Sequence, residues 1–216
     1  MHRHILIEAV SPCVDGGRHA AKTPVGEPFT VEADIFRDGH CHLRAIVKWR
    51  EKGAPRFTEV PMRHLENDRF RGEFVPTRNA PHEFAVEAWT DRYESWLDDF
   101  EKKVTADRDV TLDVREGIEL VRDAATRASG EDAPAFDRAL AGIAEATTPA
   151  ESLGAFSKQS LRDAIARADQ REDVVADSIL PVMVLPAKAW FGTWYEFFPR
   201  SEATDPARGA TLREAE

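Results

Sequence analysis

The period of the apolar residues changes twice along this chain of 216 residues, and this change limits the folds open to it. Up to about residue 100, apolar and polar residues alternate over short runs, which is typical of strands with one buried face. From about 110 to 171 the chain is rich in Ala, Arg, Asp and Glu, and its apolar residues recur at helical spacing. Beyond residue 173 it is apolar again. The pattern predicts an α+β fold in which helices interrupt a β-sheet.

The first hundred residues predict several short antiparallel strands. Within 29–36, Phe29, Val31 and Ile35 share one face, because alternate residues of a strand point the same way. Further runs of this kind lie at 42–49, 57–62, 70–75 and 84–88. Residues that favour turns separate these runs. Short strands at this spacing are typical of an immunoglobulin-like antiparallel β-sandwich.

The stretch 106–173 predicts a small α-helical bundle inserted into the sandwich. Two helices are expected before residue 147, the second of them over 134–146. A third helix begins at Thr148, because Thr148 and Glu151 have the spacing of a capping box and proline follows the threonine. We expect these helices to pack on one another through their apolar stripes.

Residues 174–200 are expected to complete the sandwich of 1–105 with returning strands, in the apolar runs 179–185 and 190–198. Aromatic residues crowd the second run, at Trp190, Phe191, Trp194, Tyr195, Phe197 and Phe198. A strand there has aromatic side chains on both faces, so one face can enter the sandwich while the other needs a cover. The helices or a further domain would supply that cover.

Composition and charge exclude several classes of partner and location. The formal net charge of -10 disfavours nucleic acids, since their binding depends on Lys and Arg that neutralise phosphates. No apolar run approaches the length of a membrane helix, and the first residues do not form a signal peptide, so we expect a cytoplasmic protein. Cys13 and Cys41 lack the CxxC spacing and are expected to be reduced thiols.

Paired carboxylates are the first candidates for catalysis. Asp98 and Asp99 are adjacent, as are Glu172 and Asp173, and retaining glycosidases need two carboxyl groups about 5 Å apart. Adjacency in sequence does not determine that distance. In a chain with 39 acidic residues, a solvated surface is the preferred interpretation, so no catalytic residue is assigned.

Two further motifs are candidate binding sites. His40 and His42 could share a metal ion, but two ligands do not make a site, and His40 falls in a turn. Residues 15–18 read Asp-Gly-Gly-Arg and could cradle a phosphate, although they lack the spacing of a phosphate-binding loop. A plain glycine turn is the preferred interpretation. We therefore predict no metal and no cofactor.

Three aromatic residues, Trp89, Tyr93 and Trp96, cluster at the end of a predicted strand and in the loop expected after it. Trp89 is out of phase with the core-facing residues of that strand. An outward tryptophan can stack on a sugar ring, or a neighbouring domain can bury it. Because the helices follow shortly downstream, burial against them is favoured, and contact with a glycan remains the alternative.

Several local sequences are distinctive, among them VGEPF at 25–29, NDRF at 67–70, VEAWTDR at 86–92 and FGTWYEFFPRS at 191–201. In order and spacing they resemble the N-terminal sandwich of the bacterial α-1,4-glucan:maltose-1-phosphate maltosyltransferases. The resemblance spans nearly the whole chain, and the last of the four sequences is the most specific.

The resemblance implies a role without catalysis. In that family a helical-bundle domain accompanies the N-terminal sandwich, and the two together build much of the homodimer interface. Catalysis belongs to a later α-amylase-type barrel with an Asp nucleophile and a Glu acid/base. None of those barrel positions occurs in this sequence, so 201–216 is expected to be a linker and the start of a missing catalytic domain. The implied role is dimerisation, positioning of the barrel through residues such as Trp190, Trp194, Tyr195, Phe197 and Phe198, and contact with α-glucan.

Two other functions compete with this one. A free-standing α-glucan-binding module would use Trp89, Tyr93 and Trp96, and it predicts an affinity for glucan that is lost on Trp89→Ala or Trp96→Ala. An enzyme in its own right is the least favoured, because no nucleophile and base can be named. The leading hypothesis, a non-catalytic module for dimerisation, predicts weak or no binding of maltooligosaccharides and a pairing of chains that depends on the helices.

Overall fold

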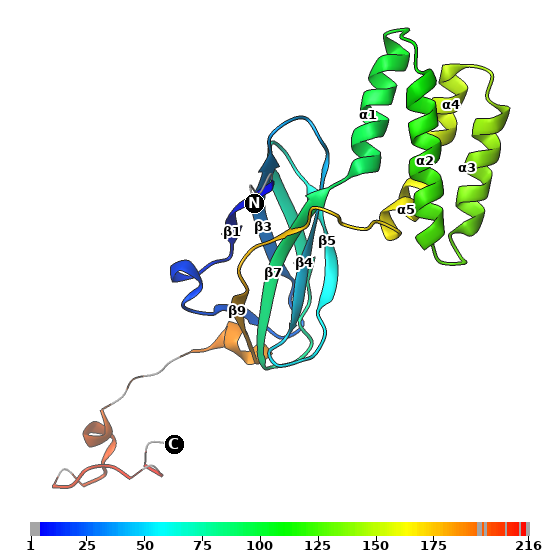
Figure 1. Ribbon diagram of the computed structural model, residues 1–216. Coiled ribbons are helices and arrows are strands. Elements are labelled where there is room, and N and C mark those ends of the chain that lie inside the picture. The colour runs from blue at the N-terminus through cyan, green and yellow to red at the C-terminus, as the bar shows by residue number, and fades with distance from the viewer. Residues whose placement is uncertain (1–4, 194–195, 197, 206, 212, 215–216) are drawn as a thin grey trace.

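The computed structural model describes residues 5–193, 196, 198–205, 207–211, 213 and 214. These residues form a mixed β-sheet and a separate group of five α-helices, so the predicted α+β class is confirmed (Figure 1). The helices lie beyond one end of the sheet, and the C-terminal segment leaves from the other end. Among the described residues, no helix has the length and apolar character needed to cross a membrane.

The sheet has nine strands, of which seven lie before residue 91 and two follow the five helices. They are β1 Ile5–Ser11, β2 Ala21–Pro24, β3 Phe29–Arg37, β4 Leu43–Glu51, β5 Thr58–His64, β6 Arg69–Phe74, β7 Pro81–Thr90, β8 Val175–Ala176 and β9 Leu180–Leu185. Their order in space is β1-β3-β6-β5-β4-β7-β9-β2, and β8 pairs with β7. Among the strands of the described residues, only β2 and β9 pair in parallel. The purely antiparallel sheet expected from the sequence is therefore corrected to a mixed one.

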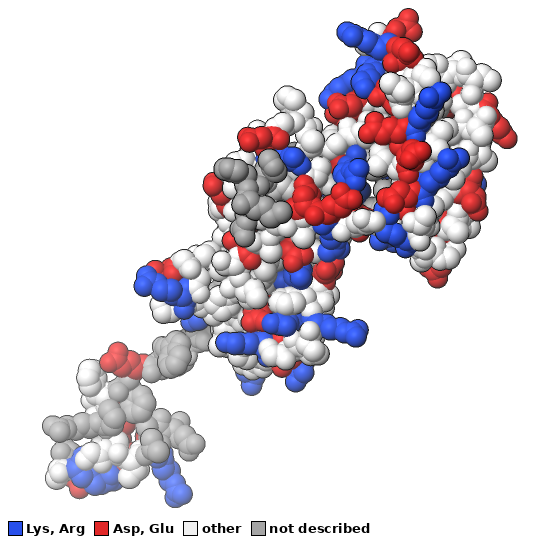
Figure 2. Space-filling view, viewed as in Figure 1, with Lys and Arg blue, Asp and Glu red and all other residues white. Residues whose placement is uncertain are grey.

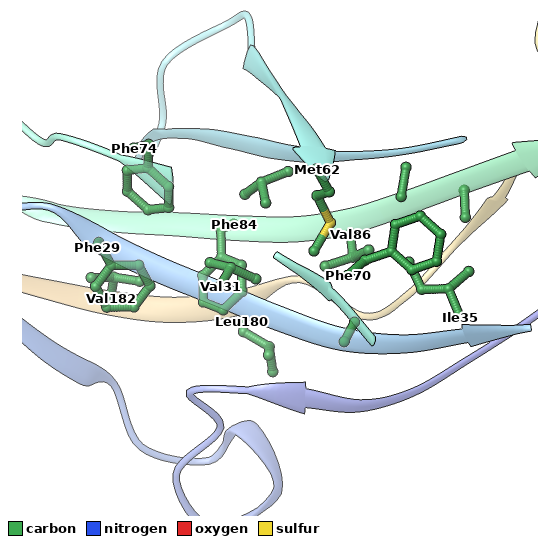
Figure 3. Close-up of a cluster of buried hydrophobic side chains, with 14 of the residues drawn as sticks. Phe29, Val31, Ile35, Met62, Phe70, Phe74, Phe84, Val86, Leu180 and Val182 are labelled. Carbon is green, nitrogen blue, oxygen red and sulfur yellow. The ribbon is translucent and has the colours of Figure 1, made fainter. Parts of the chain in front are cut away.

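The sheet curls around an apolar core to which the inward faces of its strands contribute (Figure 3). Phe29 of β3 meets Phe84 of β7 edge-on, with 5.5 Å between ring centroids, although the two strands are not neighbours in the sheet. On β3 the buried residues alternate with more exposed ones, as the sequence predicted. Val31 and Val86 are fully buried between the facing strands.

The five helices are α1 Arg92–Thr105, α2 Thr111–Arg127, α3 Ala133–Glu145, α4 Pro149–Phe156 and α5 Gln159–Arg167. They enclose a second apolar core, whose fully buried members include Phe100, Phe136 and Phe156. The capping box predicted at the start of α4 is confirmed: Thr148 accepts from the backbone N–H of Glu151, and the Glu151 side chain accepts from the backbone N–H of Thr148.

Helix α1 corrects the sequence-based boundary, which placed the first helix after residue 105 and put Tyr93 and Trp96 in a loop. The helix begins at Arg92, directly after β7. Asp91 caps it, because its carboxylate accepts a hydrogen bond from the backbone N–H of Glu94 at 3.0 Å. Tyr93, Trp96 and Phe100 then follow at spacings of three and four residues, which places them on one buried helical face.

The returning strands were predicted only in part. Strand β9 forms within the expected run 179–185, but the described residues of 190–198 form no strand. The chain turns instead into the short 3-10 helices η2, Ala187–Phe191, and η3, Pro199–Glu202. A second strand beside β9 has no place in the sheet, because β9 already pairs with β7 on one side and β2 on the other.

Candidate functional site

The junction between the sheet and the helices gathers charged side chains from distant parts of the sequence. The chain leaves the sheet through 90–92 and returns through 168–174. Acidic and basic residues lie side by side over this region in the space-filling view (Figure 2). A cavity of about 260 Å³ opens between the two parts, with residues of β7, α2 and α5 in its lining.

Trp89, the last but one residue of β7, lies inside this junction with only 4% of its surface exposed. Its indole Nε1 donates a hydrogen bond to Oδ2 of Asp169 at 2.5 Å. The guanidinium of Arg171 stacks on the indole ring, 4.5 Å from its centroid. The same guanidinium makes two hydrogen bonds to the carboxylate of Glu59 on β5, at 2.7 and 3.1 Å. Trp89 therefore anchors the returning chain to the sheet.

The other two aromatic candidates lie within the helices and do not share a surface with Trp89. Tyr93 is 3% exposed and donates its hydroxyl hydrogen to the backbone oxygen of Phe156 at 2.9 Å. Burial raises the pKa of the Tyr93 hydroxyl well above its usual range. Trp96 stacks on Phe100 with 5.2 Å between ring centroids. None of the three aromatic faces is open to a sugar ring.

Asp91 connects the end of the sheet to the first helix. Besides capping α1, its buried carboxylate forms an ion pair with Arg44 of β4. The backbone N–H of Asp91 donates to the carbonyl oxygen of His42 at 2.9 Å. One residue thus carries both the helix cap and a link to the neighbouring strand.

Asp173 fixes the returning chain to the end of β7. Its carboxylate accepts a hydrogen bond from the backbone N–H of Thr90 at 2.8 Å and another from the Thr90 hydroxyl, and it pairs with Arg37 at 3.3 Å. Burial by itself raises the pKa of Asp173, but the hydrogen bonds from Thr90 and the charge of Arg37 outweigh it. The net effect is a pKa below the usual value, so the ionised form is favoured in the folded chain.

Replacing Asp173 by asparagine is expected to lower stability at neutral pH and to matter less in acid. A carboxylate whose pKa is lowered by folding stabilises the fold above its unfolded pKa, and this contribution is lost as pH falls through the folded value. The free energy of unfolding, measured with urea, should therefore differ less between Asp173→Asn and the unmodified chain below about pH 4. Asp99→Asn, at an exposed position on α1, is the matched control. A difference that persists unchanged in acid would contradict this account.

Four basic and five acidic side chains line the cavity wall. Basic residues from the sheet and helices face a similar number of carboxylates, and the lining includes Arg37, Arg44, Arg92, Arg127, Asp91, Asp123, Asp169, Glu172 and Asp173. Arg92 and Glu172 pair at 3.0 Å, which accounts for one of the adjacent carboxylates of the sequence. Of the other adjacent pair, Asp98 is bound by Lys102 at 2.5 Å. One carboxylate of each adjacent pair in the sequence is therefore engaged in an ion pair.

The two remaining motifs are solvent-exposed features. Residues Asp15–Gly17 form a short 3-10 turn, and Arg18, which follows it, pairs with Asp15 at 2.7 Å. His42 lies 3.6 Å from Asp98. No group of three His, Cys, Asp or Glu side chains suited to a metal ion occurs within the described residues.

The helix η2, which follows β9, lies at the opposite end of the sheet from the five α-helices (Figure 1). Phe191 and Phe198 are 89% and 73% exposed. Trp190 belongs to η2. Of the other predicted interface residues, Trp194, Tyr195 and Phe197 lie outside the described residues. The sequence thus directed attention to this segment and to Trp89, but it gave no signal for the partners Arg37, Arg44 and Glu59, which lie far from 168–174 along the chain.

Comparison with known proteins identifies the family. The profile described as "Alpha-1,4-glucan:maltose-1-phosphate maltosyltransferase, domain N/S" matches residues 3–185. A maltosyltransferase of that name from Myxococcus xanthus is 39% identical over 221 residues, which cover 98% of this chain and 33% of the relative. Another from Chlorobaculum tepidum is 35% identical, covering 98% of this chain and 32% of the relative. This chain belongs to the domain N/S family of these maltosyltransferases and spans about a third of the length of the curated relatives it matches.

Proposed function

We propose that this chain is the non-catalytic N-terminal part of a maltosyltransferase that extends α-1,4-glucan from maltose 1-phosphate, and that it serves dimerisation and positioning of the catalytic barrel. The observation that carries the proposal is the domain N/S match over residues 3–185. The charge cluster at the junction supports it, since its members are engaged in holding the fold together. A cytoplasmic location and the absence of nucleic-acid partners are part of the same proposal.

The exposed aromatic residues beyond β9 support contact with a catalytic barrel. Large exposed apolar groups in a cluster mark surfaces that another domain or protein covers. Phe191 and Phe198 are large exposed apolar groups, and the segment after β9 that carries them leaves the sheet at the end opposite the helices (Figure 1). We propose the run 190–198 as the barrel contact and 201–216 as the linker to it.

We also propose a fold class for each of the two parts. We assign the curled sheet, formed by 5–90 with 175–185, to the immunoglobulin-like sandwich class, and the helices of 92–167 to an inserted bundle. The separate apolar cores of the two parts support this division. It moves the start of the insertion from residue 106, as expected from the sequence, to residue 92.

The helices are proposed to mediate dimerisation, and Leu112 provides the test. This residue of α2 is 75% exposed, more than any other large apolar side chain of the described α-helices. Leu112→Glu is expected to shift sedimentation from dimer to monomer without loss of helical signal, since a carboxylate is favourable in the first turn of a helix. Leu6→Glu on β1, where the side chain is 44% exposed, is the control. A chain that sediments as a monomer at every concentration would refute dimerisation through this part.

Burial of the three aromatic candidates counts against the alternative of a glucan-binding module. Trp89, Tyr93 and Trp96 are each less than a tenth exposed. We expect maltoheptaose to cause no saturable change in tryptophan fluorescence of this chain, and Trp89→Ala to loosen the junction instead. Saturable binding that Trp89→Ala abolishes, with the far-ultraviolet spectrum unchanged, would restore the alternative.

A further inference from the structure

The sheet and the helices are connected without sharing an apolar core. Every fully buried apolar residue of the first core belongs to a strand, whereas the second core draws on the helices and their connections, and the two have no residue in common. Between them lies the cavity of about 260 Å³, with Arg37 and Arg44 of the sheet on one side and Leu120 and Ile165 of the helices on the other. Apolar packing therefore does not fix the angle between the two parts.

Polar contacts at the two connections between the sheet and the helices, 90–92 and 168–174, fix the angle instead. The outgoing crossing is held by Asp91 with Arg44, and the returning one by Asp173 with Thr90 and by Asp169 with Trp89. Most of the charged partners are partly exposed. In the pair of Arg171 with Glu59, for example, the side chains are 33% and 41% exposed. Ion pairs with this exposure are weak individually and are screened by salt.

Arg171 occupies a special place among these contacts. Its backbone φ is 52°, in the left-handed region that a residue with a Cβ adopts only at a cost. Its side chain binds Glu59 of β5 through two hydrogen bonds and covers Trp89 of β7. One residue thus ties the returning chain to two strands and holds the crossing in a strained conformation.

We propose that the junction is an electrostatically latched hinge. The helices rotate against the sheet about 90–92 and 168–174, and Arg171 with Glu59 is the latch that selects one orientation. Ionic strength or the loss of the latch releases the rotation while both apolar cores stay intact. The device acts on the helices as a body, which goes beyond a fixed role in positioning.

Distances between spin labels test the hinge in the full chain. Labels at Lys52→Cys, in the turn directly after β4, and at Asp137→Cys in α3 report the angle, with the exposed Cys13 and Cys41 replaced by serine. Labels at Glu101→Cys and Asp137→Cys, both on helices, report the integrity of the helical part. We expect Arg171→Gln to widen the first distance distribution and leave the second unchanged. The population of other orientations should rise roughly fivefold, the ratio that corresponds to about 1 kcal/mol.

A matched control separates the latch from a general loss of charge. Arg71 pairs with Glu32 at 2.5 Å wholly within the sheet, and its side chain is 41% exposed. Arg71→Gln should leave both distributions unchanged, whereas Glu59→Gln should act as Arg171→Gln does. In about 1 M KCl the first distance distribution of the otherwise unmodified chain should also widen, because the screening length falls to about 3 Å. If the first distribution stays narrow in high salt and in both latch variants, the hinge is wrong.

Discussion

Replacing Gly117 by valine is expected to unfold the helices at denaturant concentrations that leave the sheet intact. Gly117 lies in α2, and a Cβ built there would approach two ring carbons of Trp96 to 2.3 Å and one of Phe156 to 2.8 Å. Both rings belong to the apolar core of the helices, so neither can move into open space. We expect a loss of about 3 kcal/mol, at the upper end for overpacked cores. The loss is measured by unfolding the protein in urea while monitoring the far-ultraviolet circular dichroism of the helices.

Gly154→Val provides the matched control for this prediction. Gly154 also lies in a helix, α4, but a Cβ there meets no heavy atom within 4 Å. Valine has a somewhat higher helix propensity than glycine, so this variant should be neutral or slightly stabilising. Equal effects at the two glycines would show that the close contact at Gly117 does not determine stability.

Phe84→Ala is expected to have the largest effect on the sheet. The ring of Phe84 is fully buried and lies 5.5 Å from that of Phe29 and 6.4 Å from that of Phe74, between centroids. Truncation leaves a cavity between facing strands, which costs about 3–5 kcal/mol for a phenylalanine. The midpoint temperature of thermal unfolding of the sheet should fall accordingly.

Phe191→Ala makes the same chemical change at an exposed position. The side chain is 89% exposed, so its truncation removes little packing within this chain and should alter stability by less than about 0.5 kcal/mol. A loss at Phe191 as large as that at Phe84 would mean that the C-terminal segment packs on the sheet. It would also remove the reason for assigning this segment to a barrel contact.

Features set by neighbouring residues were predictable from the sequence. The buried face of β3 followed from alternation of Phe29, Val31 and Ile35, and the start of α4 followed from Thr148 and Glu151. Such signals are local because a strand has a period of two residues and a cap spans three. The α+β class and the interruption of the sheet by helices follow from the same periods.

Features set by distant residues were not predictable. The sequence does not predict the start of helix α1, because Trp89, Tyr93 and Trp96 form one aromatic cluster along the chain, whereas Asp91 between them follows the end of β7 and caps the helix. The junction depends on Glu59, which lies far from Arg171 in sequence and meets it only once the sheet and helices are in place. Likewise the parallel pairing of β2 with β9 brings together residues near the two ends of the described fold.

The most direct test of the proposed role is a chimera with a relative. The third of the Myxococcus xanthus maltosyltransferase that matches this chain would be exchanged for this chain, and the transfer of maltosyl groups from maltose 1-phosphate to a maltooligosaccharide would be measured. We expect the relative without its matching third to be inactive, the chimera to regain activity, and this chain alone to transfer nothing. A well-folded chimera that stays inactive, or transfer by this chain alone, would contradict a non-catalytic positioning role.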